Sequence, residues 1–267
     1  MVQIVTLIEN LVYASGLTAE HGLAIYIDTG KQKVLFDTGQ SAAFLMNAKQ
    51  LGIDLSAVDA LVLSHGHYDH TGGLSAFLRH NRKARIYLKN GLFAQKYHHY
   101  DRFIGTPALS EAMQQRVTYV EGVTPLCDSL YIVPDIPVVN PVDTSFRNFY
   151  LRDGETFVPD RFHDELFLAT VSNQKLSVIS SCSHRGITNI MARAVQQFPL
   201  PIDLILGGFH LLRGDPKRDE IVVEALCKLQ PERMGVCHCT GLDAYIKLAK
   251  AFTGNLFYNH TGYSLNL

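Results

Sequence analysis

Short apolar runs separated by polar turns dominate residues 1–90 of the chain. Several runs are rich in β-branched and aromatic residues, which is typical of strands, and they cover Gln3–Ile8, Leu23–Ile27, Lys33–Phe36, Ala57–Leu63 and Arg85–Leu88. The triplet Thr29-Gly30-Lys31 predicts a hairpin turn between the second and third runs. Leu74, Phe77 and Leu78 share the spacing of one helix face, so we expect a helix over Thr71–His80.

The stretch from about 91 to 160 lacks this periodicity. It is rich in aromatic residues and contains the prolines Pro107, Pro125, Pro134, Pro137, Pro141 and Pro159. A long irregular segment inside a compact domain is typical of an insertion that acts as a lid or binds a ligand. A peripheral loop region packed by its own aromatic side chains would give the same pattern, so both interpretations stay open.

Regular alternation returns in the last hundred residues. Strands are expected at Leu166–Thr170, Leu176–Ser180, Ile202–Leu206, Arg233–Val236, Leu256–Tyr258 and Tyr263–Leu265, and helices at Ile187–Phe198, Asp219–Leu229 and Leu242–Phe252. A meander of strands followed by β–loop–α units predicts a layered α/β domain. No linker or short repeat interrupts the pattern, so we expect one domain over 1–267 with the aromatic-rich insertion at about 91–160.

Composition narrows the classes of function. The chain has 267 residues, 24 Lys and Arg against 25 Asp and Glu, and 47% hydrophobic residues, so it can bury a large core and carries a formal net charge of -1. That balance disfavours a partner such as nucleic acid, which requires clustered positive charge. The start of the chain lacks the features of a secretory signal, no apolar run reaches the roughly 18 residues of a membrane span, and the cysteines are scattered. These features favour a cytoplasmic protein.

Histidine is the unusual component, with 12 residues against 5 Cys and no Trp. Three histidines and a carboxylate, namely His65, His67, Asp69 and His70, lie within six residues in the loop SHGHYDHTGG. Neutral imidazole nitrogens and carboxylate oxygens are good ligands for zinc, iron or manganese. The loop follows a predicted buried strand and precedes a predicted helix, so it is a candidate metal-binding loop.

The same residues carry a resemblance to a known family. HGHYDH matches the H-x-H-x-D-H signature of the metallo-β-lactamase superfamily. The chain further resembles the subgroup of metal-dependent hydrolases of β-lactamase superfamily II, which includes proteins labelled 7,8-dihydropterin-6-methyl-4-(β-D-ribofuranosyl)aminobenzene-5'-phosphate synthase. That likeness rests on Glu9-Asn10, EHGLA at 20–24, LFDTGQS at 35–41, LSHGHYDHTGGL at 63–74, CSHRGITNI at 182–190, GGFHL at 207–211 and HCTG at 238–241.

The resemblance implies a four-layer αββα sandwich with the metal site at one edge between the two sheets. By the family pattern, His65, His67 and His184 would hold one metal ion, and Asp69, His70 and His238 a second. Each histidine of the C-terminal half that could contribute, namely His184, His210 or His238, follows a predicted strand, where α/β folds collect their ligands. We expect one or two divalent ions, zinc first, with iron or manganese as alternatives.

One position departs from the family pattern. Many members have an Asp that bridges both metals after the penultimate core strand, whereas this chain has LGGFHLL, with Gly208 near the expected carboxylate and His210 two residues later. A neutral imidazole offers one lone pair and does not bridge as a carboxylate does. His210 therefore either binds one metal terminally or lies outside the ligand shell and contacts substrate. The loss of one negative charge predicts a weaker second metal and a preference for anionic substrates.

Three further residues are expected to support the site. Asp37, which follows a strand in LFDTG, is a candidate for orienting a metal-binding histidine. Tyr68 is a candidate oxyanion donor, although a packing role is equally compatible with its position. Cys182 lies two residues before His184 and is expected beside the metal ligands, while Cys237 and Cys239 are expected to be small buried residues.

The leading functional hypothesis is a metal-dependent hydrolase that uses a metal-bound hydroxide on a small anionic ester or phosphoester. In it, Asp69 orients the water or receives its proton, and His210 contacts the substrate. A second hypothesis, implied by the synthase label, is a transferase that condenses a dihydropterin diphosphate with an aminobenzene ribose phosphate. A third is a metal-dependent ligand sensor without catalysis. The expected partner is a small molecule, neither a membrane nor nucleic acid, and a homo-oligomer stays open.

Overall fold

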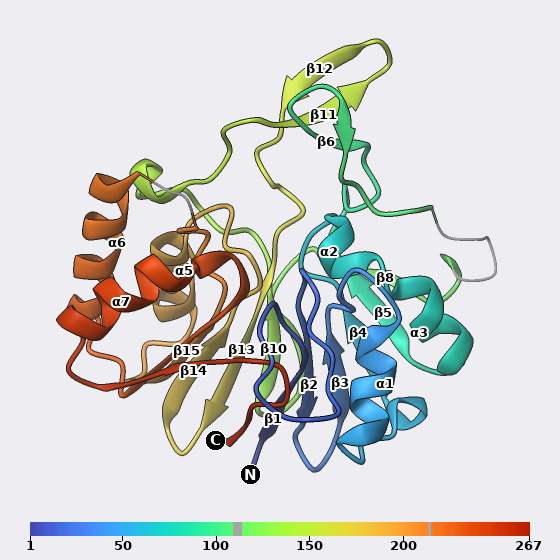
Figure 1. Cartoon of the computed structure of the whole chain (residues 1–267), viewed down its shortest axis with the longest axis horizontal. Coiled ribbons are helices and arrows are strands. Elements are labelled where there is room, and N and C mark those ends of the chain that lie inside the picture. The colour runs from blue at the N-terminus through green and yellow to red at the C-terminus, as the bar shows by residue number, and fades with distance from the viewer. Residues whose placement is uncertain (109–113, 213–214) are drawn as a thin grey trace. The chain divides into compact units, whose positions relative to one another are not determined.

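The computed structural model describes residues 1–108, 114–212 and 215–267 (Figure 1). The described residues form two units. The first comprises Met1–Glu121, Phe146–Leu166 and His260–Leu267, and the second comprises Gly122–Ser145 and Phe167–Asn259. No helix in the described part of the chain is long and apolar enough to cross a membrane.

The main sheet of the first unit has seven strands in the order β18-β1-β2-β3-β4-β5-β8. The pairs from β18 to β3 are antiparallel, and those from β3 to β8 are parallel. Because parallel strands end at the same edge of a sheet, the segments that follow β3 and β4 meet there. The strands are β1 Gln3–Ile8, β2 Ala24–Asp28, β3 Lys33–Phe36, β4 Ala60–Val62, β5 Arg85–Leu88, β8 Val117–Tyr119 and β18 Ser264–Asn266.

Helices pack their apolar side chains against this sheet. They are α1 Ala43–Gln50, α2 Tyr68–Thr71, α3 Leu74–His80 and the 3-10 helix η1 Leu55–Ala57. Phe44 of α1 and Phe77 of α3 are fully buried in the same cluster as the strand residues Leu35, Leu61 and Ile86. Leu63 and Leu74, which lie on either side of the histidine loop in the sequence, belong to the same cluster and fix both ends of the loop.

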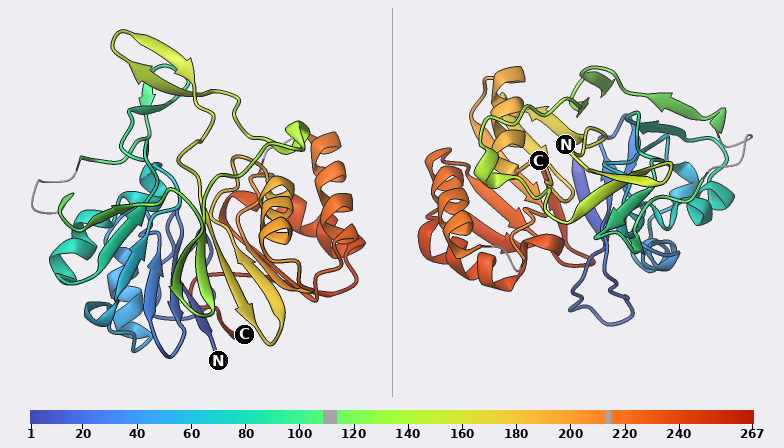
Figure 2. Two further views of the ribbon diagram at one scale, coloured as in Figure 1. Left: turned by 180° about the vertical axis from the view of Figure 1, so that it is seen from behind. Right: turned by 90° about the horizontal axis from the view of Figure 1, so that it is seen from above.

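A second, four-stranded sheet of the first unit lies beyond the carboxyl ends of the parallel strands (Figure 1 and Figure 2). Its order is β12-β11-β6-β7, from Lys96–His98 (β6), Arg102–Phe103 (β7), Phe149–Asp153 (β11) and Thr156–Pro159 (β12). A bridge between His67 and Gly105 joins it to the histidine loop, as does the bond from Tyr68 N to Ile104 O (2.9 Å). We call it the flap sheet.

A buried lysine strengthens this attachment. Lys96 of β6 contacts two buried carboxylates, Asp160 Oδ2 at 2.6 Å and Asp164 Oδ1 at 2.9 Å. The other oxygen of Asp164 accepts the backbone N–H of Gly66 at 2.8 Å. Gly66 lies between the first two loop histidines, and a side chain there would meet the Leu92 carbonyl and Lys96. The ion cluster therefore ties the flap sheet directly to the backbone of the histidine loop.

The second unit is built on another mixed sheet, of order β17-β16-β15-β14-β13-β10-β9. The pairs from β9 to β14 are antiparallel and those from β14 to β17 are parallel. The strands are β9 Thr124–Cys127, β10 Leu130–Val133, β13 Phe167–Ser172, β14 Lys175–Ile179, β15 Ile202–Gly207, β16 Arg233–Val236 and β17 Asn255–Tyr258.

Three helices cover one face of this second sheet (Figure 2). Alternate strand residues such as Leu176 and Val178 form one buried cluster with Ile190, Leu226 and Leu248, which come one from each helix. The helical segments are α5 Ile187–Gln197, α6 Pro216–Lys228, α7 Leu242–Ala251 and the 3-10 helices η2 Pro141–Asp143 and η3 His238–Thr240. Each parallel strand β14, β15 and β16 is followed by a loop that carries one candidate histidine.

The predicted α/β class is confirmed, with differences in detail. Helix α1 was not predicted. The expected strand Ala57–Leu63 is shorter, because η1 occupies its start and only Ala60–Val62 pairs as β4. The stretch 91–160 contains seven short strands in its described part, distributed over all three sheets, and its residues 109–113 lie outside the described residues. Its action as a lid stays a prediction.

The Lys96 ion cluster yields a stability prediction. Lys96→Met leaves Asp160 and Asp164 as buried carboxylates without their cation, so we expect the free energy of unfolding in urea to fall by about 3 kcal/mol or more. Lys175→Met breaks an exposed pair with Glu232 and is the matched control, with an expected loss below about 1 kcal/mol. Equal losses in the two variants would contradict the anchoring role of Lys96.

Candidate metal centre

The structure of the first unit brings together all four metal-ligand candidates of the HGHYDH loop. His65, His67, Asp69 and His70 are buried, although all four are ionisable. The ring of His65 lies 4.7 Å from that of His67 and 4.5 Å from that of His70. The Nε2 atom of His70 lies 3.5 Å from Asp69 Oδ2. Burying such groups side by side is costly unless they share a ligand or a network.

Asp37 supplies that network. This fully buried carboxylate accepts Ser64 N–H at 2.8 Å and the Ser64 hydroxyl at 2.7 Å. It also lies 3.0 Å from Nδ1 of His70. The Ser64 hydroxyl is in turn 2.9 Å from Nδ1 of His65. One carboxylate thus supports two of the loop histidines, one directly and one through a serine.

The direction of these hydrogen bonds fixes the ring tautomers. A carboxylate only accepts, so the Ser64 hydroxyl donates to Asp37 and must accept from His65. His65 and His70 therefore both carry hydrogen on Nδ1, which leaves Nε2 as the atom for a metal. Burial, with His70 and His67 nearby, lowers the pKa of His65 well below its usual value, which keeps it neutral. Burial also lowers the pKa of His70, but Asp69 and Asp37 outweigh it and raise that pKa to about 10.

Two other contacts surround the loop. Asp69 Oδ2 lies 3.3 Å from Nε2 of His21, a residue in the EHGLA motif to which the sequence analysis gave no role. Tyr68 has the Arg102 guanidinium of the flap sheet at 3.0 Å from its hydroxyl oxygen. Because Arg102 donates that bond, the Tyr68 hydroxyl hydrogen stays directed elsewhere.

The second unit gathers its own set of candidates. Cys182, His184 and His238 are buried. The Cys182 sulfur lies within 4.8 Å of a ring nitrogen of His184 and within the same distance of one of His238. A thiolate is itself a zinc ligand, so Cys182, which we expected beside the ligands, has the chemistry and the spacing of a ligand. Nδ1 of His184 lies 3.3 Å from the Ser145 carbonyl, which leaves its buried Nε2 for a metal.

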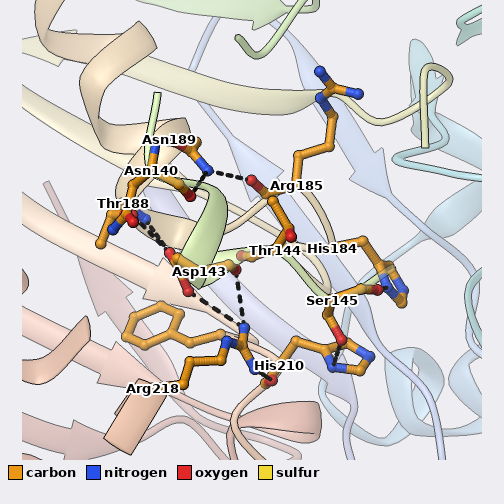
Figure 3. Close-up of polar contacts among 12 residues, drawn as sticks. Asn140, Asp143, Thr144, Ser145, His184, Arg185, Thr188, Asn189, His210 and Arg218 are labelled. Carbon is orange, nitrogen blue, oxygen red and sulfur yellow. Dashed lines mark hydrogen bonds and ion pairs between the residues drawn. The ribbon is translucent and has the colours of Figure 1, made fainter. Parts of the chain in front are cut away.

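His210 lies beside His184, with ring centroids 4.3 Å apart. Its Nδ1 is 2.8 Å from the Ser145 hydroxyl. Its carbonyl accepts Nη1 of Arg218 at 2.7 Å, and Arg218 also contacts Asp143 (Figure 3). Sequence reasoning missed Ser145, Asp143 and Arg218, since each is a single polar residue without a motif.

The departure at Gly208 has a physical basis in the second unit. A Cβ atom at Gly208 would lie 2.6 Å from the Cys239 sulfur and 2.6 Å from the Ser181 carbonyl. The backbone there has no room for a carboxylate side chain. The expected bridging acid is therefore missing from the sequence and also excluded by the packing.

Backbone strain is concentrated near the candidates. Asp37, His210 and His238 have φ of 61°, 51° and 51°, and Ser183, next to His184, has 55°. Residues other than glycine enter this left-handed region at a cost of about 1–3 kcal/mol, and such strain clusters at functional sites. Its presence in both units is consistent with loops shaped to present particular side chains.

The donor set fits a divalent metal. Imidazole Nε2 atoms whose Nδ1 is held by a carboxylate, a hydroxyl or a carbonyl are the arrangement that metal-binding histidines have in proteins. Imidazole, carboxylate and thiolate together favour zinc over calcium or magnesium. The first unit offers His65, His67, Asp69 and His70, and the second unit offers Cys182, His184 and His238.

Comparison with known proteins agrees with this chemistry. Residues 17–159 match the model of the family described as "Metallo-beta-lactamase superfamily". A curated relative from Methanocaldococcus jannaschii, 7,8-dihydropterin-6-methyl-4-(beta-D-ribofuranosyl)-aminobenzene-5'-phosphate synthase, is 28% identical over 98% of this chain and 95% of its own length.

Solved structures show the same fold over the full length of the chain. Tm1679, a metal-dependent hydrolase of the beta-lactamase superfamily, is 30% identical with a TM-score of 0.88, covering 100% of this chain and 99% of its own. Zinc-bound PqqB from Methylobacterium extorquens is 11% identical with a TM-score of 0.61, covering 99% of this chain and 100% of its own, and supports the fold alone.

The network around Asp37 predicts the effect of its loss on metal affinity. Asp37→Asn replaces an acceptor-only group with an amide that cannot accept all three donors, so His65 and His70 lose their fixed orientation. We expect zinc affinity to fall about 10–100-fold, measured by competition with a chelating indicator. Asp54→Asn changes an exposed helix cap and is the control. Affinities equal to that control in folded Asp37→Asn protein would contradict the role of Asp37.

Proposed function

Because the chain belongs to the metallo-beta-lactamase superfamily, we propose that it is a metal-dependent hydrolase of a small anionic ester or phosphoester. The observation that supports this most is that three buried histidines, His65, His70 and His184, have Nδ1 held by hydrogen bonds, so that Nε2 is the atom that each can present to a metal. We further propose that His65, His67 and His184 hold one ion and that Asp69, His70 and His238 hold a second.

The chain's own residues would orient the reacting water, accept its proton and exclude other water from the site. A bound divalent ion supplies a Lewis acid that activates water and polarises the substrate oxygen. Asp69, in contact with His21 and His70, would orient that water and receive its proton. The buried loop and the aromatic residues of the flap sheet would exclude other water from the reacting group.

A cationic group beside the loop supports an anionic substrate. Arg102 holds the Tyr68 hydroxyl oxygen while remaining exposed itself, so it offers further donors to a phosphate or carboxylate. The Tyr68 hydroxyl would donate to the same anion. The absence of a bridging acid at Gly208 leaves more positive charge on a bound metal pair, which also favours an anion.

A specific observation keeps the transferase hypothesis as a second candidate. The His67 ring lies 5.3 Å from each of the rings of Phe149 and Phe162, and Phe162 stacks on Phe146 at 5.9 Å. Phe162 is fully buried, whereas Phe146 and Phe149 are partly exposed and would form an aromatic wall, which favours a flat ring in the substrate. A pterin has such a ring, as does an aryl phosphoester, so this wall alone does not separate the two reactions.

An activity assay separates the hydrolase, transferase and sensor hypotheses. Metal-loaded protein is tested on bis-p-nitrophenyl phosphate, phenyl phosphonates, lactones and thioesters. Under the hydrolase proposal at least one is turned over, and His67→Ala lowers that turnover by more than about 100-fold, beyond the effect of changes outside the ligand shell. His80→Ala, an exposed change on α3, is the control.

Other outcomes would overturn the hydrolase proposal. Consumption of pterin diphosphate only in the presence of an arylamine, without turnover of any ester, would establish a transferase. Tight ligand binding without any chemistry would instead establish a sensor.

The role of Arg102 is tested by substrate charge. Arg102→Gln should raise KM for an anionic phosphodiester about tenfold at nearly constant kcat, as expected when one charge-assisted contact is lost from both ground and transition states. The KM of a neutral lactone should not change. Arg152→Gln, on the same flap sheet, is the matched control. An equal change for neutral and anionic substrates would contradict anion recognition by Arg102.

A further inference from the structure

Ser145 contacts both candidate histidines of the second unit, with different atoms. Its backbone N–H donates to the His184 carbonyl at 2.7 Å, and its carbonyl lies 3.3 Å from Nδ1 of His184. Its hydroxyl lies 2.8 Å from Nδ1 of His210. Figure 3 shows Ser145 between the two rings.

We propose that Ser145 fixes His184 and His210 in opposite tautomers, so that His184 binds metal and His210 donates a hydrogen bond to the substrate. A carbonyl oxygen only accepts, so Nδ1 of His184 carries the hydrogen and Nε2 keeps the lone pair that a metal requires.

In the hydrogen bond between Ser145 and His210, we assign the hydrogen to the serine hydroxyl and not to Nδ1 of the ring. The Ser145 hydroxyl has one hydrogen to donate. Among the described residues, the only hydrogen-bond partner of the Ser145 hydroxyl is Nδ1 of His210. Donation from the hydroxyl to Nδ1 satisfies both groups and places the ring hydrogen on Nε2. An Nε2–H group is a donor and cannot bind a metal ion.

Ser64 provides an internal comparison for this assignment. It makes the same serine-to-Nδ1 contact, with His65 at 2.9 Å, but its hydroxyl hydrogen is committed to Asp37 at 2.7 Å. The Ser64 hydroxyl therefore accepts from its histidine, whereas the Ser145 hydroxyl donates. The same pair of residue types thus yields a metal-ligand tautomer in one unit and a donor tautomer in the other.

The backbone of His210 is held to present this donor. His210 has φ of 51°, and its carbonyl is fixed by Arg218 at 2.7 Å. Arg218 also bonds the Asp143 carbonyl at 3.0 Å, and Asp143 Oδ2 accepts the N–H and the hydroxyl of Thr188, each at 2.8 Å. This network contacts the backbone of His210, whereas Ser145 contacts its ring at Nδ1.

The inference rests on the proposed function in one respect, because a donor at His210 needs an oxygen of an anionic substrate as its acceptor. Its assignment of tautomers and ligands can still be tested without any substrate. The full-length protein, free of metal, is labelled with ¹⁵N, and its histidine rings are observed by long-range ¹H–¹⁵N NMR. Loss of one signal set in His184→Gln and in His210→Gln assigns the two rings.

The expected spectrum shows His184 with hydrogen on Nδ1 and His210 with hydrogen on Nε2. Ser145→Ala should release the His210 tautomer and leave His184 unchanged, because both contacts to His184 are made by the backbone. Ser145→Thr should restore the wild-type pattern. Thr144→Ala removes a neighbouring hydroxyl bonded to Pro141 and should change neither ring. Hydrogen on Nδ1 of His210 in the wild type, or equal changes at both rings in Ser145→Ala, would overturn the proposal.

Zinc content supplies an independent readout. After equilibration with zinc alone, His210→Ala should retain the wild-type number of ions per chain, and His184→Ala should lose one. Equal loss of zinc from both variants would refute the assignment. Because neither readout measures turnover, a protein that passes both tests and hydrolyses no ester would refute the proposed function and leave this inference intact.

Discussion

Asp37 determines the orientation of two histidine rings, His65 and His70, in the histidine loop of the first unit. It is a buried carboxylate, and a carboxylate only accepts hydrogen bonds, so every group around it must direct a hydrogen inward. Ser64 and His70 both donate to Asp37. Because its hydrogen is used in this way, the Ser64 hydroxyl accepts a hydrogen bond from Nδ1 of His65. The result is a pair of imidazoles whose Nδ1 atoms are held by hydrogen bonds, so that Nε2 is the atom that each ring can present to a metal. The Lys96 cluster then fixes the loop backbone through Asp164 and Gly66.

The second unit solves the same orientation problem without a carboxylate next to the rings. There a backbone carbonyl orients His184, and a serine hydroxyl orients His210. Packing at Gly208 excludes the acid that many superfamily members have near this position. The chain therefore lacks this negative charge and has a histidine, His210, two residues after Gly208. A donor in place of that charge suits an anionic substrate, which brings its own negative charge to the site.

Local signals explain what could be predicted from the sequence. The strands Gln3–Ile8, Lys33–Phe36, Arg85–Leu88 and Arg233–Val236 were predicted with the bounds that the structure has, because each is an apolar run between turn residues. The histidine loop was found because its ligand-type residues are adjacent in sequence. Helix α1 was missed because its eight residues follow no N-cap side chain.

What the sequence could not reveal depends on contacts distant along the chain. Strand β6 pairs with β11, more than fifty residues later, so neither has a local signature. The roles of His21 and Ser145 arise from neighbours that only the folded chain provides. The ambiguity over His210 had the same origin, since its tautomer depends on which partner faces Nδ1.

The central claim is that the two units present pre-oriented histidines to zinc and that His210 stays outside the metal's ligand shell. A crystal structure of the zinc-loaded protein with phosphate, with anomalous data at the zinc edge, tests it directly. The account predicts zinc peaks bound by Nε2 of His65, His67 and His184, and Nε2 of His210 within hydrogen-bond distance of a phosphate oxygen. Zinc bound by His210, or no zinc at the HGHYDH loop, would contradict it.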